Sequence, residues 1–351
     1  MELSQEQKTV LYKIVSNVRK GKMITTLGGY AGTGKSTIIR FLKKFFPDFA
    51  VVAYTGKAAN VLRKKGLQAS TIHSLIYQPV TDHKGEVHFS LAHDLGCNGI
   101  IIDEASMVSD EIYEDLKSFK IPLIFVGDHG QLEPINSDFN LMARPEFKLE
   151  QIHRNAGDIA HFANHLRNGY SAASYRSKTD SVVILRSNQL TDGLMASVEQ
   201  CVCGFNKTRV IVNTRIRAYK GYKNLLEKGE RIICLRNNKQ LALFNGMQGV
   251  LLDFYKDGSR KYFVDFQFEE FIYNKVWIDL NQFGKEKNEF EFKKDTPNPF
   301  DYAYCCTAHK VQGDEFDSVL VIEQRSNQWD FRRWAYTCAS RAREKLYWVL
   351  S

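Results

Sequence analysis

The chain of 351 residues is long enough for roughly two or three domains with their own hydrophobic cores. Its formal net charge of +8 suits a polyanionic partner but is also compatible with ordinary basic surface charge. The seven cysteines contain no C-x-x-C pair, which argues against a disulfide framework and favours reduced thiols. The sequence has no apolar run of about 18 residues, and its N-terminus, "MELSQEQKTV", is too polar for a signal peptide. We therefore expect a soluble, intracellular protein without a membrane partner.

The first predicted elements surround a glycine-rich loop, "GGYAGTGKST" (28–37). A buried strand is expected over residues 23–27, and a helix over residues 37–46. The loop between them fits the phosphate-cradling pattern G-x-x-x-x-G-K-[ST]. A glycine-rich turn with an incidental lysine is the alternative, but the flanking strand and helix favour a nucleotide site.

The residue types of this loop suit phosphate binding. Glycines permit positive φ and let backbone N–H groups turn toward an anion. A helix that begins near Lys35 would point its N-terminal dipole at the same anion. Lys35 would reach the β- and γ-phosphates of ATP, and the hydroxyl of Ser36 would ligate Mg²⁺. The predicted nucleotide-binding residues of the loop are Gly29, Gly32, Thr33, Gly34, Lys35, Ser36 and Thr37.

Paired carboxylates follow a second apolar strand in "NGIIIDEASMVS" (98–109). Ligands of open α/β sheets collect at the carboxyl ends of the strands, where these acids would lie. Asp103 could hold Mg²⁺ directly or through water, and Glu104 could accept a proton from an attacking water. A helix N-terminus enriched in acids is the alternative, but beside a phosphate-binding loop the catalytic interpretation is favoured.

A third apolar strand, in "IPLIFVGDHGQLEPI" (121–135), ends in Gly127-Asp128 and is followed by Gln131. The neutral amide of Gln131 can hydrogen-bond a γ-phosphate or position a water, and this contact would disappear after hydrolysis. Taken alone, G-D-x-x-Q also suits an ordinary loop. We assign Gln131 to the site because its strand end lies in register with the other two.

Eight short motifs follow one another along the chain: "GYAGTGKST", "AYTGKAANVL", "STIHSLIY", "IIDEASMVS", "VGDHGQLEPI", "QIHRN", "TAHKVQGDEFDSVLV" and "YTCASRAREKLYWV". In this order they resemble the superfamily 1 helicases, and within them the RecD/Dda-type, superfamily 1B branch. The resemblance covers nearly the whole chain. It implies an α/β fold with two RecA-like P-loop domains on parallel sheets, a small β-hairpin insertion and an SH3-like β-barrel insertion.

The resemblance also implies a division into domains. A hairpin (1B) at about 76–97 would match the insertion that relatives use as a wedge at the fork. Its aromatic residue, Phe89, would either stack on bases or anchor the hairpin. Short β-rich runs broken by Gly, Asn and Asp favour a small barrel in the SH3-like position. The expected domains are 1–150 for the first RecA-like domain (1A), 151–227 plus 296–351 for the second (2A), and 228–295 for the barrel (2B).

Further nucleotide contacts are implied by the family. Gln7 in "LSQEQ" matches a glutamine that reads adenine, and this interpretation is favoured over the alternative of one glutamine in a polar amphipathic helix. Arg154 in "HRN" and Arg341 in "SRAR" match two arginines that approach the γ-phosphate from the second motor domain. Gly313 and Glu315 match the motif that links the nucleotide cleft to the strand-binding surface. The predicted catalytic residues are therefore Lys35, Glu104, Gln131, Arg154 and Arg341.

Contacts to nucleic acid are implied at several strand ends of both RecA-like domains. A hydroxyl, a bare backbone and an ammonium after an apolar strand suit a phosphodiester backbone. The two histidines in this set could instead be hydrogen-bonded loop or core residues. Contacts to phosphate and sugar would make binding largely sequence-independent and salt-sensitive. The predicted residues are Thr55, Gly56, Lys57, Thr71, His73, Phe89, Thr307 and His309.

The sequence as a whole predicts an ATP- and Mg²⁺-dependent motor, a 5′-to-3′ DNA helicase and translocase acting on single-stranded and forked duplex DNA. A simple translocase or an RNA-directed helicase with the same motor stays open. A P-loop kinase or nucleotide-switched binding protein is a further alternative, although it would not need the two arginines. We expect a monomer in the cytoplasm of a bacterial or phage-infected cell, with a role in DNA replication, repair or recombination and possible protein partners from replication or recombination.

Overall fold

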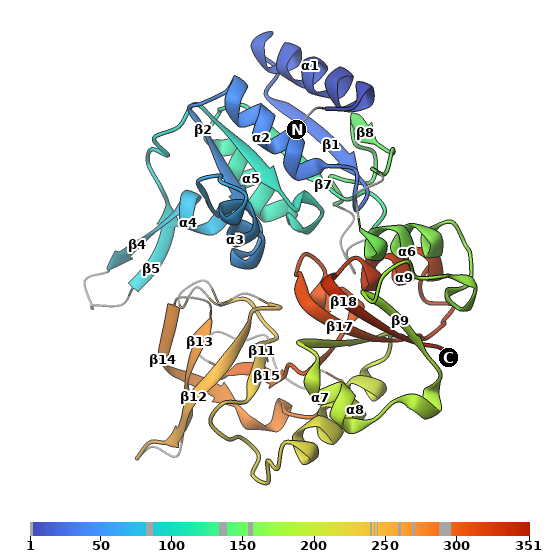
Figure 1. The fold of residues 1–351 in the computed structure, drawn as a ribbon. Helices are drawn as coiled ribbons and strands as arrows, with labels where there is room; N and C mark the ends of the chain where they lie inside the picture. The colour runs from blue at the N-terminus through green and yellow to red at the C-terminus, as the bar shows by residue number, and fades with distance from the viewer. Residues whose placement is uncertain are drawn as a thin grey trace.

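Two units with parallel sheets, a small hairpin and a closed barrel make up the fold (Figure 1). The computed structural model describes residues 3–81, 87–132, 139–153, 157–238, 241, 243, 245–258, 261–268, 271–287 and 296–351. This architecture confirms the predicted α/β class with its hairpin and barrel insertions. Of the helices that the structure describes, none combines the length and the apolar character needed to span a lipid bilayer.

The N-terminal sheet has six parallel strands among the described residues, in the order β3-β2-β6-β7-β1-β8. They are β1 (Ile24–Gly29), β2 (Phe49–Ala53), β3 (Ala69–Thr71), β6 (Gly99–Asp103), β7 (Leu123–Gly127) and β8 (Phe147–Leu149). Strands β6 and β7 are buried along their whole length, as expected for near-continuous apolar runs in a parallel sheet covered on both faces. The helices of this unit are α1 (Gln5–Arg19), α2 (Lys35–Phe45), α3 (Gly56–Lys64), α4 (Ile72–Ile76), η1 (Ala105–Met107) and α5 (Asp110–Ser118).

The C-terminal sheet is also parallel, with the order β16-β10-β17-β18-β9. Its strands are β9 (Val182–Leu185), β10 (Gln200–Cys203), β16 (Cys305–Thr307), β17 (Phe316–Ile322) and β18 (Ala342–Val349). Its helices are α6 (Asp158–Arg167), η2 (Ala172–Ser174), η3 (Ser187–Gln189), α7 (Asp192–Ser197), α8 (Asn206–Tyr219), η6 (Ala308–Val311) and α9 (Phe331–Ala339). The two sheets thus belong to separate units, and the loops after β1, β6 and β7 of the first lie against segments that precede β9, β17 and β18 of the second.

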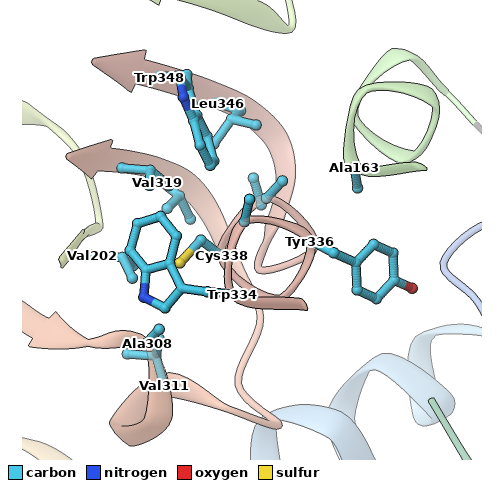
Figure 2. Packing of buried hydrophobic residues seen from close by; sticks show 14 of the residues in the cluster. Ala163, Val202, Ala308, Val311, Val319, Trp334, Tyr336, Cys338, Leu346 and Trp348 are labelled. Atoms are coloured by element: carbon cyan, nitrogen blue, oxygen red, sulfur yellow. The ribbon is translucent and has the colours of Figure 1, made fainter. Parts of the chain in front are cut away.

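Two tryptophans form the centre of the C-terminal core (Figure 2). Trp334 and Trp348 are fully buried, with their ring centroids 6.2 Å apart in an edge arrangement. The indole N–H of Trp348 donates a hydrogen bond of 2.8 Å to the buried Oε2 of Glu323, which satisfies its only polar atom. Tyr336 lies on the same helix, α9, but its ring points away from this cluster (Figure 2).

The barrel is formed by β11 (Arg231–Cys234), β12 (Gln248–Lys256), β13 (Tyr262–Phe268), β14 (Phe271–Asp279) and β15 (Asn298–Tyr302), with η5 (Leu280–Gln282) after β14. Strand β15 lies beyond the boundary at residue 295 that the sequence suggested. It completes the barrel by pairing antiparallel with β11 and parallel with β14. The sequence "KKDTPNPF" (293–300) predicts a linker, because proline is disfavoured in central strands. Pro299 nevertheless lies in β15, where its carbonyl accepts a hydrogen bond from Leu235 N–H.

The hairpin insertion consists of β4 (Tyr77–Thr81) and β5 (Val87–Leu91), paired antiparallel. The chain enters it directly from α4, and Figure 1 shows it extending from the N-terminal sheet on the same side as the barrel. The side chain of Phe89 lies outside the described residues, so its predicted role as a wedge or an anchor stays a prediction.

Lys120 adopts a left-handed backbone conformation, with φ of 53°, directly after the end of α5. Its N–H donates to the carbonyl of Lys117, as is common where glycine ends a helix. A Lys120→Gly variant is therefore expected to be more stable by about 0.5–1 kcal/mol, because glycine removes the steric cost of positive φ. Thermal melting checks this, with Lys120→Ala as the matched control. Equal melting temperatures for the glycine and alanine variants would contradict the prediction.

Candidate active site

A cleft of about 620 Å³ lies between the two sheet units. One wall consists of the loop after β1, the start of α2 and the carboxyl ends of β6 and β7. The other wall comes from the start of α6, the residue before β9, the loop before β17 and the segment that leads from α9 into β18. Its lining includes the predicted residues Gly32, Gly34, Lys35, Ser36, Thr37, Asp103, Glu104, Gln131, Glu315 and Arg341. The structure therefore brings ten of the predicted residues together around one cavity.

The glycine-rich loop turns sharply into α2, which begins at Lys35, two residues before the predicted start. Gly32 and Gly34 have φ values of 80° and 86°, a region that favours glycine. The ammonium of Lys35 donates to the carbonyl oxygens of Gly29 at 2.7 Å and Tyr30 at 3.2 Å. These bonds hold the Lys35 ammonium over its own loop.

Asp103 and Glu104 follow β6 at the floor of the cleft. Asp103 accepts a hydrogen bond of 3.0 Å from the backbone N–H of Glu104, which itself has a left-handed φ of 54°. The Oε2 atom of Glu104 is buried and accepts no hydrogen bond from any described residue. Burial, and then the charge of Asp103, raise the pKa of Glu104 to about 8. A carboxylate of raised basicity that faces a cavity is suited to accept a proton from water.

The oxygen donors near the phosphate loop fit a magnesium ion. Ser36 Oγ accepts a hydrogen bond of 3.0 Å from the ammonium of Lys65, and Asp103 lines the same cleft. Mg²⁺ prefers hard oxygen ligands and usually takes only one or two from protein, with phosphate and water completing its shell. The hydroxyl of Ser36 and the carboxylate of Asp103 match that preference, and the ammonium of Lys65 already lies beside Ser36.

Arg341 faces Glu104 from the C-terminal unit. Its side chain is 2 % exposed, and its guanidinium donates to the carbonyls of Thr337 and Asp314 and to Ser340 Oγ at 2.9–3.0 Å. Its charge partly offsets the rise in the pKa of Glu104 that burial causes. Arg341 is thus fixed on the C-terminal wall of the cleft, and its contact to a γ-phosphate stays a prediction.

Gly313 and Glu315 precede β17 on the same wall. Gly313 has a φ of 82°, and a Cβ atom there would lie 2.7 Å from Cγ of Met107 in η1. This position requires glycine because the two units approach closely. Glu315 lines the cleft, where its charge adds to the rise in the pKa of Asp103 that burial causes.

The side chain of Gln7 makes two kinds of contact in the structure. Its Oε1 accepts a hydrogen bond of 3.0 Å from Ser4 N–H, which caps α1. Its amide N–H donates to the carbonyl of Thr33 at 2.9 Å and lies 2.7 Å from Nε2 of His153. Gln7 therefore belongs to the amphipathic helix and also contacts the phosphate loop, while its contact to adenine stays a prediction.

Two other predictions concern residues of the cleft. Gln131 is buried, and its Oε1 accepts no hydrogen bond from any residue that the structure describes. An amide oxygen in this state is available for a water or a ligand. Arg154 lies outside the described residues, so its predicted role is untested.

The predicted nucleic-acid contacts lie away from this cleft, at other strand ends. Thr55 caps α3 by accepting from Ala58 N–H at 3.2 Å, and Thr71 caps α4 by accepting from Ser74 N–H at 3.1 Å. Because β2 and β3 are neighbours, these two hydroxyls and Gly56 share one edge of the sheet. The side chain of Lys57 lies outside the described residues.

The remaining contacts of this kind come from both units. Thr307 ends β16 and precedes η6 in the C-terminal unit. His309 lies in η6, and burial lowers its pKa. In the N-terminal unit, the ring of His73 stacks on Tyr77 at 5.6 Å. Both histidines therefore also satisfy the alternative interpretation as packed residues.

Sequence reasoning missed several residues of the cleft and its boundary. Lys65 donates to Ser36, and the guanidinium of Arg167 lies 3.6 Å above the ring of Tyr30 in the phosphate loop. Tyr336 contacts Asp128 and Ala31 from the C-terminal unit. The basic run "RKKG" after α3 could have indicated Lys65, whereas the other contacts depend on how distant segments pack.

Comparison with known proteins agrees with this arrangement. Residues 2–185, more than half of the chain, match the family model of an AAA domain, and residues 302–349 match the UvrD-like helicase C-terminal domain. The ATP-dependent DNA helicase dda of Enterobacteria phage T4 is 29% identical over 190 residues, which cover 48% of this chain and 43% of that protein. The chain spans less than half the length of the curated relatives that it matches.

Solved structures of Pif1 helicases share the fold. A complex of two Pif1 helicases at forked duplex DNA has a TM-score of 0.55 at 17% identity, covering 99% of this chain and 92% of the other. Bacteroides Pif1 bound to single-stranded DNA has a TM-score of 0.53 at 17% identity, with the same coverage. With the matching domain model over more than half of its length and the motifs in their order along the sequence, the chain belongs to the superfamily 1B helicases of the RecD and Dda type.

Proposed function

We propose that the chain is an ATP- and Mg²⁺-dependent DNA helicase that moves along single-stranded DNA from 5′ to 3′ and unwinds duplex DNA. The observation that carries the proposal is the composition of the cleft. A phosphate loop and a catalytic carboxylate on one unit face a buried arginine on the other. A nucleotide bound there would contact both units, so its hydrolysis would change how they are held together.

The chemistry follows from the positions of four side chains. Lys35 releases its two carbonyl partners and turns to the β- and γ-phosphates. Glu104 accepts a proton from the attacking water, which Gln131 orients with its unpaired amide oxygen. Arg341 donates to the oxygens on which negative charge develops. Mg²⁺ held by Ser36 and Asp103 would neutralise charge on the β- and γ-phosphates.

Strand binding is assigned to the outer strand ends of both sheets. Thr55, Gly56 and Thr71 share one edge of the N-terminal sheet, and Thr307 ends a strand of the C-terminal sheet. A DNA backbone bound at both places would be held more tightly first by one unit and then by the other as the cleft opens and closes. The named activity of the phage T4 relative and the single-stranded DNA bound by Bacteroides Pif1 support DNA as the substrate.

The remaining assignments follow the family. The barrel, the hairpin and the "STIHSL" motif support 5′-to-3′ movement. The proposed domains are 1A over about 1–150 with hairpin 1B, barrel 2B, and 2A, whose second part resumes after β15 at about residue 303. We also propose a monomer that acts in the cytoplasm on single-stranded and forked DNA, with partners in replication, repair or recombination.

ATP turnover is expected to rise sharply when single-stranded DNA is added, and a duplex with a 5′ single-stranded tail should be opened. A duplex with only a 3′ tail should stay closed, because translocation would carry the motor away from the junction. Strand-separation assays on 5′-tailed, 3′-tailed and RNA-tailed duplexes measure this directly. Efficient opening from a 3′ tail would contradict the polarity, opening from an RNA tail would favour an RNA-directed helicase, and ATPase activity indifferent to DNA would favour a kinase or a switch protein.

A further inference from the structure

One buried tyrosine of the C-terminal unit contacts two segments of the N-terminal unit. Tyr336 lies on α9 with no exposed surface, and its ring leaves the tryptophan core (Figure 2). Its hydroxyl donates a hydrogen bond of 2.5 Å to Asp128 Oδ2 and accepts one of 2.6 Å from Ala31 N–H. A single phenol therefore joins the loop after β7 to the phosphate loop.

Asp128 is also the buried carboxylate nearest to Lys35 in this structure. Its Oδ1 accepts the N–H of Gly130 at 2.9 Å, and its Oδ2 lies 3.8 Å from the ammonium of Lys35. That distance is an ion pair without a direct hydrogen bond, since Lys35 donates to two backbone carbonyls instead. A carboxylate that is 3 % exposed gains strongly from a close donor, so the hydrogen bond from Tyr336 lowers the attraction of this oxygen for Lys35.

We propose that Tyr336 is a positioning residue for Lys35, acting through Asp128. The phenol donates to Oδ2 of Asp128 and so weakens the attraction of this carboxylate for the Lys35 ammonium, which can turn to a phosphate more readily. The proposal rests on the proposed function. It adds that the C-terminal unit, through Tyr336, controls whether Lys35 is available to a phosphate.

The phenol of Tyr336 would move together with the rest of the C-terminal unit. Thr337, the next residue of α9, accepts a hydrogen bond of 2.9 Å from Leu132 N–H, and Gln312 donates one of 2.6 Å to the carbonyl of Leu132. All of these groups are buried. Separation of the two units would withdraw the phenol together with these contacts, and Asp128 would then bind Lys35. Lys35 is therefore ready for phosphate only while the units are together.

Binding of ADP without DNA tests this proposal in the full chain. Tyr336→Phe removes one oxygen and keeps the ring, so Asp128 should pair with Lys35 and the Kd for ADP should rise about tenfold or more. The KM for ATP should rise in parallel, while kcat changes less. In an Asp128→Asn background, which lacks the competing charge, Tyr336→Phe should change the Kd less than twofold.

Tyr304→Phe is the matched control, because its hydroxyl accepts from Arg231 N–H and bonds to the Tyr222 side chain, both away from the phosphate loop. It should leave ADP binding unchanged, and thermal melts should show all variants folded. A tenfold loss that persists in the Asp128→Asn background would overturn the proposal, as would an unchanged Kd for Tyr336→Phe. A wild-type chain that binds no ADP would instead overturn the proposed function.

Discussion

A Glu104→Gln variant is expected to bind ATP with close to wild-type affinity while its turnover falls by about 10²- to 10⁴-fold. The substitution keeps the size of a side chain that is buried at the floor of the cleft and removes only its ability to take a proton. Its left-handed backbone is unaffected, since the strain at φ of 54° is the same for both residues. Single-turnover hydrolysis and equilibrium binding of ATP, measured on the same preparation, separate the two effects.

The pH profile gives this prediction a second readout. Because Glu104 must be deprotonated to act, kcat/KM should rise as the pH passes through its pKa of about 8, and this limb should be lost in Glu104→Gln. Lys35→Ala supplies the contrast, since it should lose nucleotide affinity as well as turnover. Hydrolysis by Glu104→Gln at the wild-type rate would show that another group is the base.

The main strands and the cleft could be predicted because the sequence patterns that indicate them lie within short segments of the chain. Apolar runs that end in Gly29, Asp103 and Gly127 are strands whose carboxyl ends must meet at one edge of a parallel sheet. Glycines at positive φ and a lysine at the start of α2 follow from the same short segment. These residues needed no knowledge of distant packing, and the structure places them around one cavity.

Features that depend on distant segments could not be predicted in this way. Tyr336 and Asp128 are 208 positions apart, and nothing in either local sequence states that they share a hydrogen bond. Strand β15 is recognised only once β11 and β14 are placed on either side of it. The helix that contains Gln7 could be predicted, because it depends on local sequence. The hydrogen bond from Gln7 to Thr33 could not, because it joins two separate segments.

The Arg341→Ala variant is expected to retain most of its nucleotide affinity and to lose about 10³- to 10⁵-fold in kcat, the range that an arginine finger supplies. Arg341 already lies against the cleft, buried and held by three hydrogen bonds, so little side-chain entropy is lost when it meets a phosphate. Arg341 and Glu104 line the same cleft from opposite units. DNA-stimulated ATP turnover and ATP binding measure the effect.

Removing Arg341 also removes the donors to Thr337, Asp314 and Ser340, so stability must be measured beside the kinetics. Arg343→Ala is the matched control. Its guanidinium lines the same cleft two residues further on but forms an ion pair with Asp317 at the surface, an interaction that contributes little to stability. We expect Arg343→Ala to keep kcat within a few-fold of wild type. Equal kcat for wild type and Arg341→Ala, with both proteins folded, would mean that Arg341 only holds α9 to β17, and the second unit would then have to act on the phosphates through another residue.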